Sequence, residues 1–194
     1  MSCKYPGCPL PVFAGSSFCS ISHRDAASGT QPSPSQPRPP GFQVPSRSQI
    51  SFYERGQPYY EFTNFSDHPI RYDGKDYPTA EHLFQSLKFE DNTLIELIRT
   101  QLTPRAAFET AQKYNTMIRP GWYDKQLNIK MMEKTVLLKF TQHQDLKKLL
   151  IGTGDAVLKE NSPIDRFWGI GSDGRGENHL GLVLMRIRAL LKNT

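Results

Sequence analysis

The stretch YPTAEHLFQSLKF, residues 77–89, predicts a helix that Pro78 opens. At about 100° per residue, one arc of this helix is apolar and consists of Ala80, Leu83, Phe84 and Leu87. Glu81, Gln85 and Lys88 form a polar stripe beside that arc. Glu81 and Lys88 are roughly 10 Å apart along the axis, so both could face a ligand lying along the helix. The alternative interpretation is a solvated flank.

Apolar residues continue at strand or helix spacing from Gln49 to Leu191. Strands are expected at Ile50–Tyr53 and in a hairpin over Ile70–Tyr77, where Asp73-Gly74 suits a type I′ turn. Further helices are expected near 91–100, from Thr103-Pro104 to about Tyr114, over 124–141, ending near Gly152, and over 179–191. The expected fold class is therefore α+β, a mainly helical single domain with a few short strands.

The helix expected over 124–141 has the clearest periodicity. Its apolar side is formed by Ile129, Met132, Val136 and Phe140. Lys130, Lys134 and Lys139 are expected on its other sides.

Composition indicates a soluble globular protein: 37% of the 194 residues are hydrophobic and 22% are charged. No apolar run reaches the roughly 18 residues that a membrane span needs, and the N-terminus lacks signal-peptide features. An intracellular location, cytoplasmic or nuclear, is expected. Residues 1–48 contain four basic residues and one acidic residue, whereas the remainder has 20 basic and 18 acidic residues. The main domain is therefore not strongly basic, and composition permits a nucleic-acid partner without requiring one.

All three cysteines lie near the N-terminus, in the order Cys3, Cys8 and Cys19, followed by His23. An odd number of cysteines cannot form a closed disulfide set. Three thiolates and one imidazole match a structural zinc shell, so residues 1–25 are predicted to form a Cys3His zinc knuckle. Unrelated cysteines in a tail are the alternative. Residues 26–48 are rich in proline and serine and are expected to be a linker to a catalytic domain at 49–192.

Two further patches contain residue types that packing alone does not require. Arg119-Pro120-Gly121-Trp122-Tyr123 precedes the long helix, and its tryptophan suits either a hydrophobic staple or stacking on a purine or sugar. The second patch, residues 162–178, contains four closely spaced glycines before the last helix. Such glycines let the backbone approach a ligand, and a helix N-terminus attracts anions. We expect a phosphate here, at Gly169, Gly171, Gly174, Gly176 and Asn178.

Taken together, YPTAEHLFQSLKF, the Trp122 patch, KFTQHQDLKKLLIGTGD and SPIDRFWGIGSDGRGENHLGLVLMRIRALL resemble the NADAR, or YbiA-like, family. The resemblance begins at Phe52-Tyr53 and Tyr60–Ser66 and extends to Leu191. It implies an α+β domain with N-glycosidase activity. The implied substrates are ADP-ribosylated guanine or the phosphoribosylamino pyrimidines of early riboflavin synthesis.

The resemblance also implies roles for individual residues. Lys88, Glu81 and Asp165 would be catalytic, and Trp122 and Trp168 would clamp the heterocycle or sugar. Asn64, Phe65, Gln85 and Arg119 are further predicted substrate contacts. Lys88 could attack the ribose C1 to form a Schiff base, with Glu81 assisting proton transfer. In the alternative scheme, two carboxyl groups stabilise the transition state and activate water.

The favoured substrate is ADP-ribose on guanine, as nucleotide or in DNA or RNA, because a tethered knuckle suits a macromolecule. The riboflavin-pathway pyrimidine is the alternative substrate. A different class of function, a binding module that recognises ADP-ribose or nucleic acid without turnover, also stays open. Structural zinc is the one expected cofactor, and none is expected for catalysis. No membrane partner is expected, and the sequence does not indicate an oligomeric state.

Overall fold

In the described part of the chain, two pairs of short strands accompany the helices. The computed structural model describes residues 48–193. β1 (Gln49–Phe52) pairs in parallel with β4 (Val157–Glu160), so that Phe52 lies opposite Glu160. β2 (Ile70–Tyr72) and β3 (Lys75–Tyr77) form the predicted antiparallel hairpin. Asp73 and Gly74 have φ values of 49° and 72°, the left-handed conformation that a type I′ turn requires. β4 was not predicted from the sequence.

Helices hold far more of the described region than strands do, which confirms the α+β, mainly helical prediction. The α-helices are α2 (Ala80–Ser86), α3 (Asn92–Arg99), α4 (Pro104–Lys113), α5 (Leu127–Gln142), α6 (Gln144–Gly152) and α7 (His179–Lys192). Two short 3₁₀ helices are η1 (Tyr60–Phe62) and η2 (Asn115–Met117).

Capping explains where two helices begin. Helix α2 starts at Ala80, not at Pro78, because Thr79 is its N-cap and accepts a hydrogen bond from the His82 N–H. It ends at Ser86, so Lys88 lies just beyond the helix and not on its continuous face. Helix α5 starts at Leu127, later than predicted, because Gln126 before it has a left-handed backbone with φ 54°.

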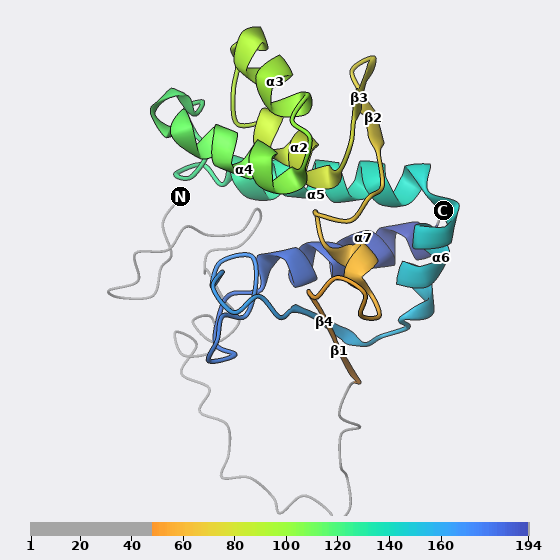
Figure 1. Cartoon of the computed structure of the whole chain (residues 1–194). Helices are drawn as coiled ribbons and strands as arrows, with labels where there is room; N and C mark the ends of the chain where they lie inside the picture. The colour runs from red at the N-terminus through yellow and green to blue at the C-terminus, as the bar shows by residue number, and fades with distance from the viewer. Residues whose placement is uncertain (1–47, 194) are drawn as a thin grey trace, which may run out of the picture. The chain divides into compact units, whose positions relative to one another are not determined.

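The two longest helices form the centre of the fold. Helices α5 and α7 pack against each other, and α2 contacts α3, α4 and α5. Helix α7 also contacts α6 and β4. In Figure 1, α2, α3 and α4 lie on one side of α5, whereas the β1–β4 pair lies beyond α7.

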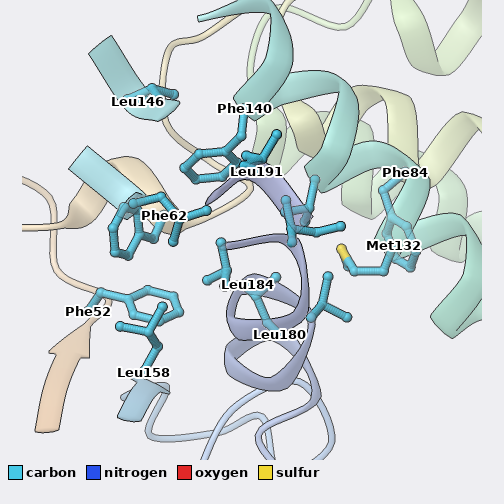
Figure 2. Packing of buried hydrophobic residues seen from close by; sticks show 14 of the residues in the cluster. Phe52, Phe62, Phe84, Met132, Phe140, Leu146, Leu158, Leu180, Leu184 and Leu191 are labelled. Carbon is cyan, nitrogen blue, oxygen red and sulfur yellow. The ribbon is translucent and has the colours of Figure 1, made fainter. Parts of the chain in front are cut away.

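The main core joins segments from both ends of the described region (Figure 2). Phe62 packs edge-on against Phe52, with ring centroids 5.7 Å apart, and lies 5.8 Å from Phe140 of α5. Leu180 and Leu184 add the buried face of α7. Removing such apolar area from water drives folding at about 25 cal/mol per Å², so this core holds the two halves of the domain together.

Lys139 of α5 is buried, with 1% of its surface exposed. The sequence had predicted it away from the buried, apolar side of this helix. It follows Met132 by seven residues, which returns it to the same side of the helix after two turns. Its Nζ donates to the carbonyl oxygens of Glu61 and Thr63, at 2.5 and 2.8 Å, and to Ser66 Oγ at 2.6 Å. Burial lowers the pKa of Lys139 to about 7. This buried amine fixes the turn of residues 61–66.

The predicted zinc ligands Cys3, Cys8, Cys19 and His23 lie outside the described residues, as does the linker up to residue 47. Among residues 48–193, none of the helices has both the length and the apolar character to cross a membrane.

Candidate active site

A cavity of about 560 Å³ opens between segments that are distant in sequence. The turn at residues 63–65, helices α2 and α4, the end of β4 and the loop at residues 162–168 all contribute side chains to its wall. Seven residues predicted from the sequence line it: Asn64, Phe65, Glu81, Gln85, Lys88, Asp165 and Trp168. The structure therefore brings the three predicted catalytic residues to one cavity.

Glu81 is buried in the cavity wall, with 6% of its surface exposed. Gln85 Nε2 donates a hydrogen bond of 2.7 Å to Glu81 Oε1. Burial raises the pKa of Glu81, whereas the hydrogen bonds from Gln85 and Asn64 and the charge of Lys88 oppose that rise. A carboxyl group whose pKa is raised in this way is suited to take up and release a proton during a reaction.

Lys88 follows the end of α2, but its charge still interacts with that of Glu81. Burial lowers the pKa of the Lys88 amine, and the Glu81 charge opposes this effect. Its carbonyl oxygen accepts a hydrogen bond of 2.9 Å from the Arg119 N–H, and its Nζ lies 5.8 Å from the centre of the Phe84 ring. A desolvated amine of lowered pKa has the property that a lysine nucleophile needs.

Asp165 and Trp168 belong to one tight turn. Asp165 Oδ1 accepts hydrogen bonds from the N–H groups of Phe167 and Trp168, at 2.9 and 2.7 Å. The Trp168 ring meets Phe84 edge-on at 5.4 Å. The carboxylate thus orients the tryptophan in the cavity wall.

Trp122 lies in the core, with only 2% of its surface exposed, and its ring is 5.5 Å from Phe84. It lines a smaller neighbouring cavity of about 260 Å³. That cavity shares Phe84, Lys88, Asp165 and Trp168 with the larger one. Trp122 therefore supports the wall between the two cavities and does not line the larger one.

The glycine-rich loop at residues 169–178 lines neither cavity, and Arg119 does not line them either. Arg119 Nη2 donates to the Phe89 carbonyl oxygen. In the loop, the N–H groups of Gly171, Gly174, Gly176 and Asn178 all donate to carbonyl oxygens of the protein. The first N–H groups of α7, from His179 and Leu180, donate to Phe167 and Trp168. These groups, expected to bind a phosphate, are engaged within the protein.

The side chain of Asn178 instead forms hydrogen bonds with the backbone of β4. Its Oδ1 accepts from the Glu160 N–H at 2.9 Å, and its Nδ2 donates to the Leu158 carbonyl oxygen at 2.8 Å. Gly169 is close enough to the same strand that an added Cβ would lie 2.8 Å from the Glu160 carbonyl oxygen. Both residues position the end of β4, beside the cavity.

Several residues that line the cavity were not predicted from the sequence. Glu160 contributes a third carboxyl group, and Arg55 and Arg105 contribute positive charge. Aromatic rings come from Tyr53, Tyr60 and Phe108 as well. Arg105 and Phe108 follow Pro104 on α4 and look like ordinary surface residues in sequence, and Glu160 ends a strand that was not predicted. Only the position of Glu160 just before the 162–178 patch could have suggested it.

Residues 48–193 contain no cluster of three or more His, Cys, Asp or Glu side chains arranged to hold a metal ion. The proposed zinc ligands belong to the part of the chain before that range.

Comparison with known proteins identifies the family of this domain. The family model described as the NADAR domain matches residues 51–192. N-glycosidase YbiA of Escherichia coli (strain K12) is 38% identical over 142 residues, which are 73% of this chain and 88% of that protein. N-glycosidase Npun_R5314 of Nostoc punctiforme is 39% identical over 147 residues, covering 74% and 93%.

Two further matches concern structure and pathway. The NMR structure of the E. coli protein YbiA is similar with a TM-score of 0.70 and 37% identity, covering 77% of this chain and 88% of that one. The riboflavin biosynthesis protein VVA0006 of Vibrio vulnificus is 37% identical over 143 residues, 74% of this chain but only 38% of that protein. From the matched range and these identities, the chain belongs to the NADAR domain family.

Proposed function

We propose that this chain is an N-glycosidase that removes ADP-ribose from guanine. The N-glycosidase activity itself is supported by the relatives of that name, which it matches over nearly their full length. The observation that carries the finer proposal is the composition of the cavity. Beside Glu81, Lys88 and Asp165, its wall has two arginines and several aromatic rings that cleavage of one C–N bond does not require.

The two arginines suit a diphosphate. Arg55 and Arg105 come from separate segments, the loop after β1 and helix α4, yet both line the cavity. Guanidinium groups bind phosphate oxygens through charge-assisted hydrogen bonds. A diphosphate gives each of the two arginines a phosphate, whereas a monophosphorylated ribose offers one group for both.

The aromatic rings suit a second heterocycle. Tyr53, Tyr60, Phe65 and Phe108 line the cavity in addition to Trp168. Flat rings of this kind stack on nucleobases with little regard to sequence. ADP-ribosyl guanine has two purines, one on each side of the diphosphate, and the cavity of about 560 Å³ is within the usual size range for small-molecule sites.

The bond to be broken joins the ribose C1 to a base nitrogen. As this bond lengthens, positive charge develops on C1 and the ring oxygen, and a nearby carboxylate stabilises it. Asp165 is suited to this role, since two backbone N–H groups hold its carboxylate in place. Lys88 attacks C1, with Glu81 receiving and returning a proton. In the second scheme, Glu81 deprotonates water for the same attack.

A phosphoribosylamino pyrimidine is the second candidate substrate. The observation that favours it is the similarity to the riboflavin biosynthesis protein of Vibrio vulnificus. This substrate also has a nitrogen heterocycle on C1 of a phosphorylated ribose, so the same three residues would act on it.

A structural zinc site at Cys3, Cys8, Cys19 and His23 is a further part of the proposal. A tethered zinc knuckle supports a macromolecular substrate such as DNA or RNA carrying ADP-ribosyl guanine. Elemental analysis is expected to find one zinc per chain in the purified protein. The Cys19→Ser variant is expected to contain no bound zinc. Full metal content in that variant would contradict the site.

A side-by-side turnover assay tests the proposed substrate. The full chain is incubated with ADP-ribosylated guanine DNA and, separately, with the phosphoribosylamino pyrimidine. We expect kcat/KM to be at least tenfold higher for the ADP-ribosylated substrate. The reverse preference would replace the proposal by the second candidate, and tight binding without released ADP-ribose would identify a binding module.

A further inference from the structure

Glu160 is a third carboxyl group in the cavity, and nothing in the mechanism above uses it. It ends β4, and its side chain lines the cavity together with Glu81 and Asp165. Its Oε2 is closed off from solvent and has no hydrogen-bond partner among residues 48–193. A buried carboxylate without partners is costly, whereas a neutral carboxyl group is tolerated much better.

The surrounding charges also favour the protonated form. Burial raises the pKa of Glu160 to about 8, and the negative charges of Asp165 and then Glu81 add to the effect. Lys88, Arg55 and Arg105 line the same cavity, but the charges that shift the pKa of Glu160 are those of Asp165 and Glu81. Glu160 therefore carries a proton at neutral pH in the free protein.

The backbone at Glu160 is held on both sides. Its N–H donates to Asn178 Oδ1 at 2.9 Å, and its carbonyl oxygen accepts from the Ile170 N–H at 2.9 Å. The strand register places it opposite Phe52, whose ring is in the core. These contacts hold the backbone of Glu160 at the cavity wall before any ligand arrives, so the residue that carries the carboxyl group is fixed in position.

We propose that Glu160 is the catalytic acid that protonates the departing heterocycle. This inference rests on the proposed N-glycosidase function, and it holds for either nucleophile and either substrate. As the C1–N bond breaks, its electron pair goes to the base nitrogen, and the Glu160 proton is transferred to the base. Glu160 is left as a carboxylate.

The proton is replaced from the water that hydrolysis consumes. Water supplies its oxygen to C1, directly or after Lys88 has formed an intermediate there, and releases one proton to the group of three carboxyls. That proton restores neutral Glu160, so the net reaction adds one water across the C1–N bond. Glu81 acts on the attacking side and Glu160 on the leaving side, a division that two carboxyl groups in different environments allow.

The test compares Glu160→Gln with the wild-type full chain across pH 5 to 10, on both substrates. Glutamine keeps the size of the side chain and its neutral form but has no acidic proton to give. We expect kcat to fall about 10²- to 10⁴-fold, the usual loss of a general acid, with KM nearly unchanged. Wild-type kcat should also decline as pH rises through about 8, and the variant should lack this decline. Glu90→Gln, at an exposed carboxyl, is the matched control and should behave as wild type.

Two results would overturn the inference while leaving the proposed function intact: a Glu160→Gln enzyme within threefold of wild type, or an impaired one that keeps the decline near pH 8. Wild-type protein inactive on both substrates would instead refute the proposed function. If the variant does not fold, ¹³C NMR of glutamate-labelled wild-type protein gives the answer. One side-chain carboxyl is expected to titrate near pH 8, and its absence would refute the inference.

Discussion

Gln85 Nε2 donates a hydrogen bond of 2.7 Å to Glu81 Oε1, one turn earlier on α2. The other end of the same amide, Gln85 Oε1, is buried without a partner in the described part of the chain. Glu81 is thus held by a neutral donor and not by a cation in direct contact. This arrangement orients the carboxyl group but leaves it able to take up and release a proton.

Glu81→Gln should reduce kcat about 10²- to 10⁴-fold, because it removes a proton-transferring group. The thermal unfolding midpoint should stay the same or rise, since an amide is less costly to bury than a carboxylate. Steady-state kinetics and calorimetry on the same preparation check both statements. A variant with normal kcat would show that Glu81 is only structural.

Lys88 can be tested by trapping. Borohydride added during turnover should reduce a Schiff base and leave ribose covalently on Lys88, which peptide mass spectrometry detects. Because only the free amine attacks and burial lowers its pKa, the yield of adduct should rise with pH on the acid side, and it should fall again once Glu160 loses its proton near pH 8. No adduct in a turning-over enzyme, together with an active Lys88→Ala, would favour the two-carboxylate scheme.

The arginine pair should distinguish the two substrates. Arg55→Gln and Arg105→Gln are each expected to raise KM about tenfold for the ADP-ribosylated substrate, the cost of about 1.4 kcal/mol. The effect on the monophosphorylated pyrimidine should be clearly smaller for at least one of them. Both side chains form exposed ion pairs, with Asp67 and Glu109, so stability should change little. Equal effects on both substrates would contradict the diphosphate assignment.

Glu160 should also make stability depend on pH. Between its ordinary pKa of 4.5 and the folded value of about 8, the folded protein holds a proton that the unfolded chain has released. Its contribution to stability is complete below pH 4.5, declines as pH rises and is lost above about 8. Urea unfolding should show wild type losing stability relative to Glu160→Gln as pH rises over this range, because glutamine resembles the neutral carboxyl group and does not ionise. A constant difference would contradict the raised pKa.

Lys139→Met should destabilise the domain by about 2–4 kcal/mol, because three buried acceptors lose their donor. KM should rise as well, since the turn that Lys139 holds supplies Thr63, Asn64 and Phe65 to the cavity. Lys134→Met, on an exposed part of the same helix, is the control and should cost less than about 1 kcal/mol. Similar losses in both variants would argue against a special role for Lys139.

Local sequence signals predicted much of the fold. The Asp73-Gly74 turn and the Thr103-Pro104 helix start were both confirmed, because each depends on backbone preferences of neighbouring residues. β4 was missed, since Val157–Glu160 becomes a strand by pairing with β1, more than a hundred residues earlier. Lys139 was misplaced because lysine is expected at the surface, and only the tertiary structure provides its three acceptors.

The candidate site was predicted only in part, because local sequence signals mark some of its residues and tertiary packing alone brings the others to it. Glu81, Lys88 and Asp165 belong to sequence patches with distinctive residue types, and the structure places all three at one cavity. The phosphate site predicted at the glycine loop relied on free N–H groups, but the loop folds back on itself and these groups donate to its own carbonyl oxygens. Glu160 and Arg105 have ordinary sequence neighbours, and only the packing of β4 and α4 brings them to the cavity.

The central claim, cleavage of the ribosyl C–N bond, is tested most directly by mass spectrometry of the products from ADP-ribosylated guanosine. Wild-type protein is predicted to yield intact ADP-ribose and unmodified guanosine, whereas Glu81→Gln should form the same products about 10²- to 10⁴-fold more slowly. Release of AMP with phosphoribosyl-guanosine would mean that the diphosphate bond was cut instead, and would contradict the account.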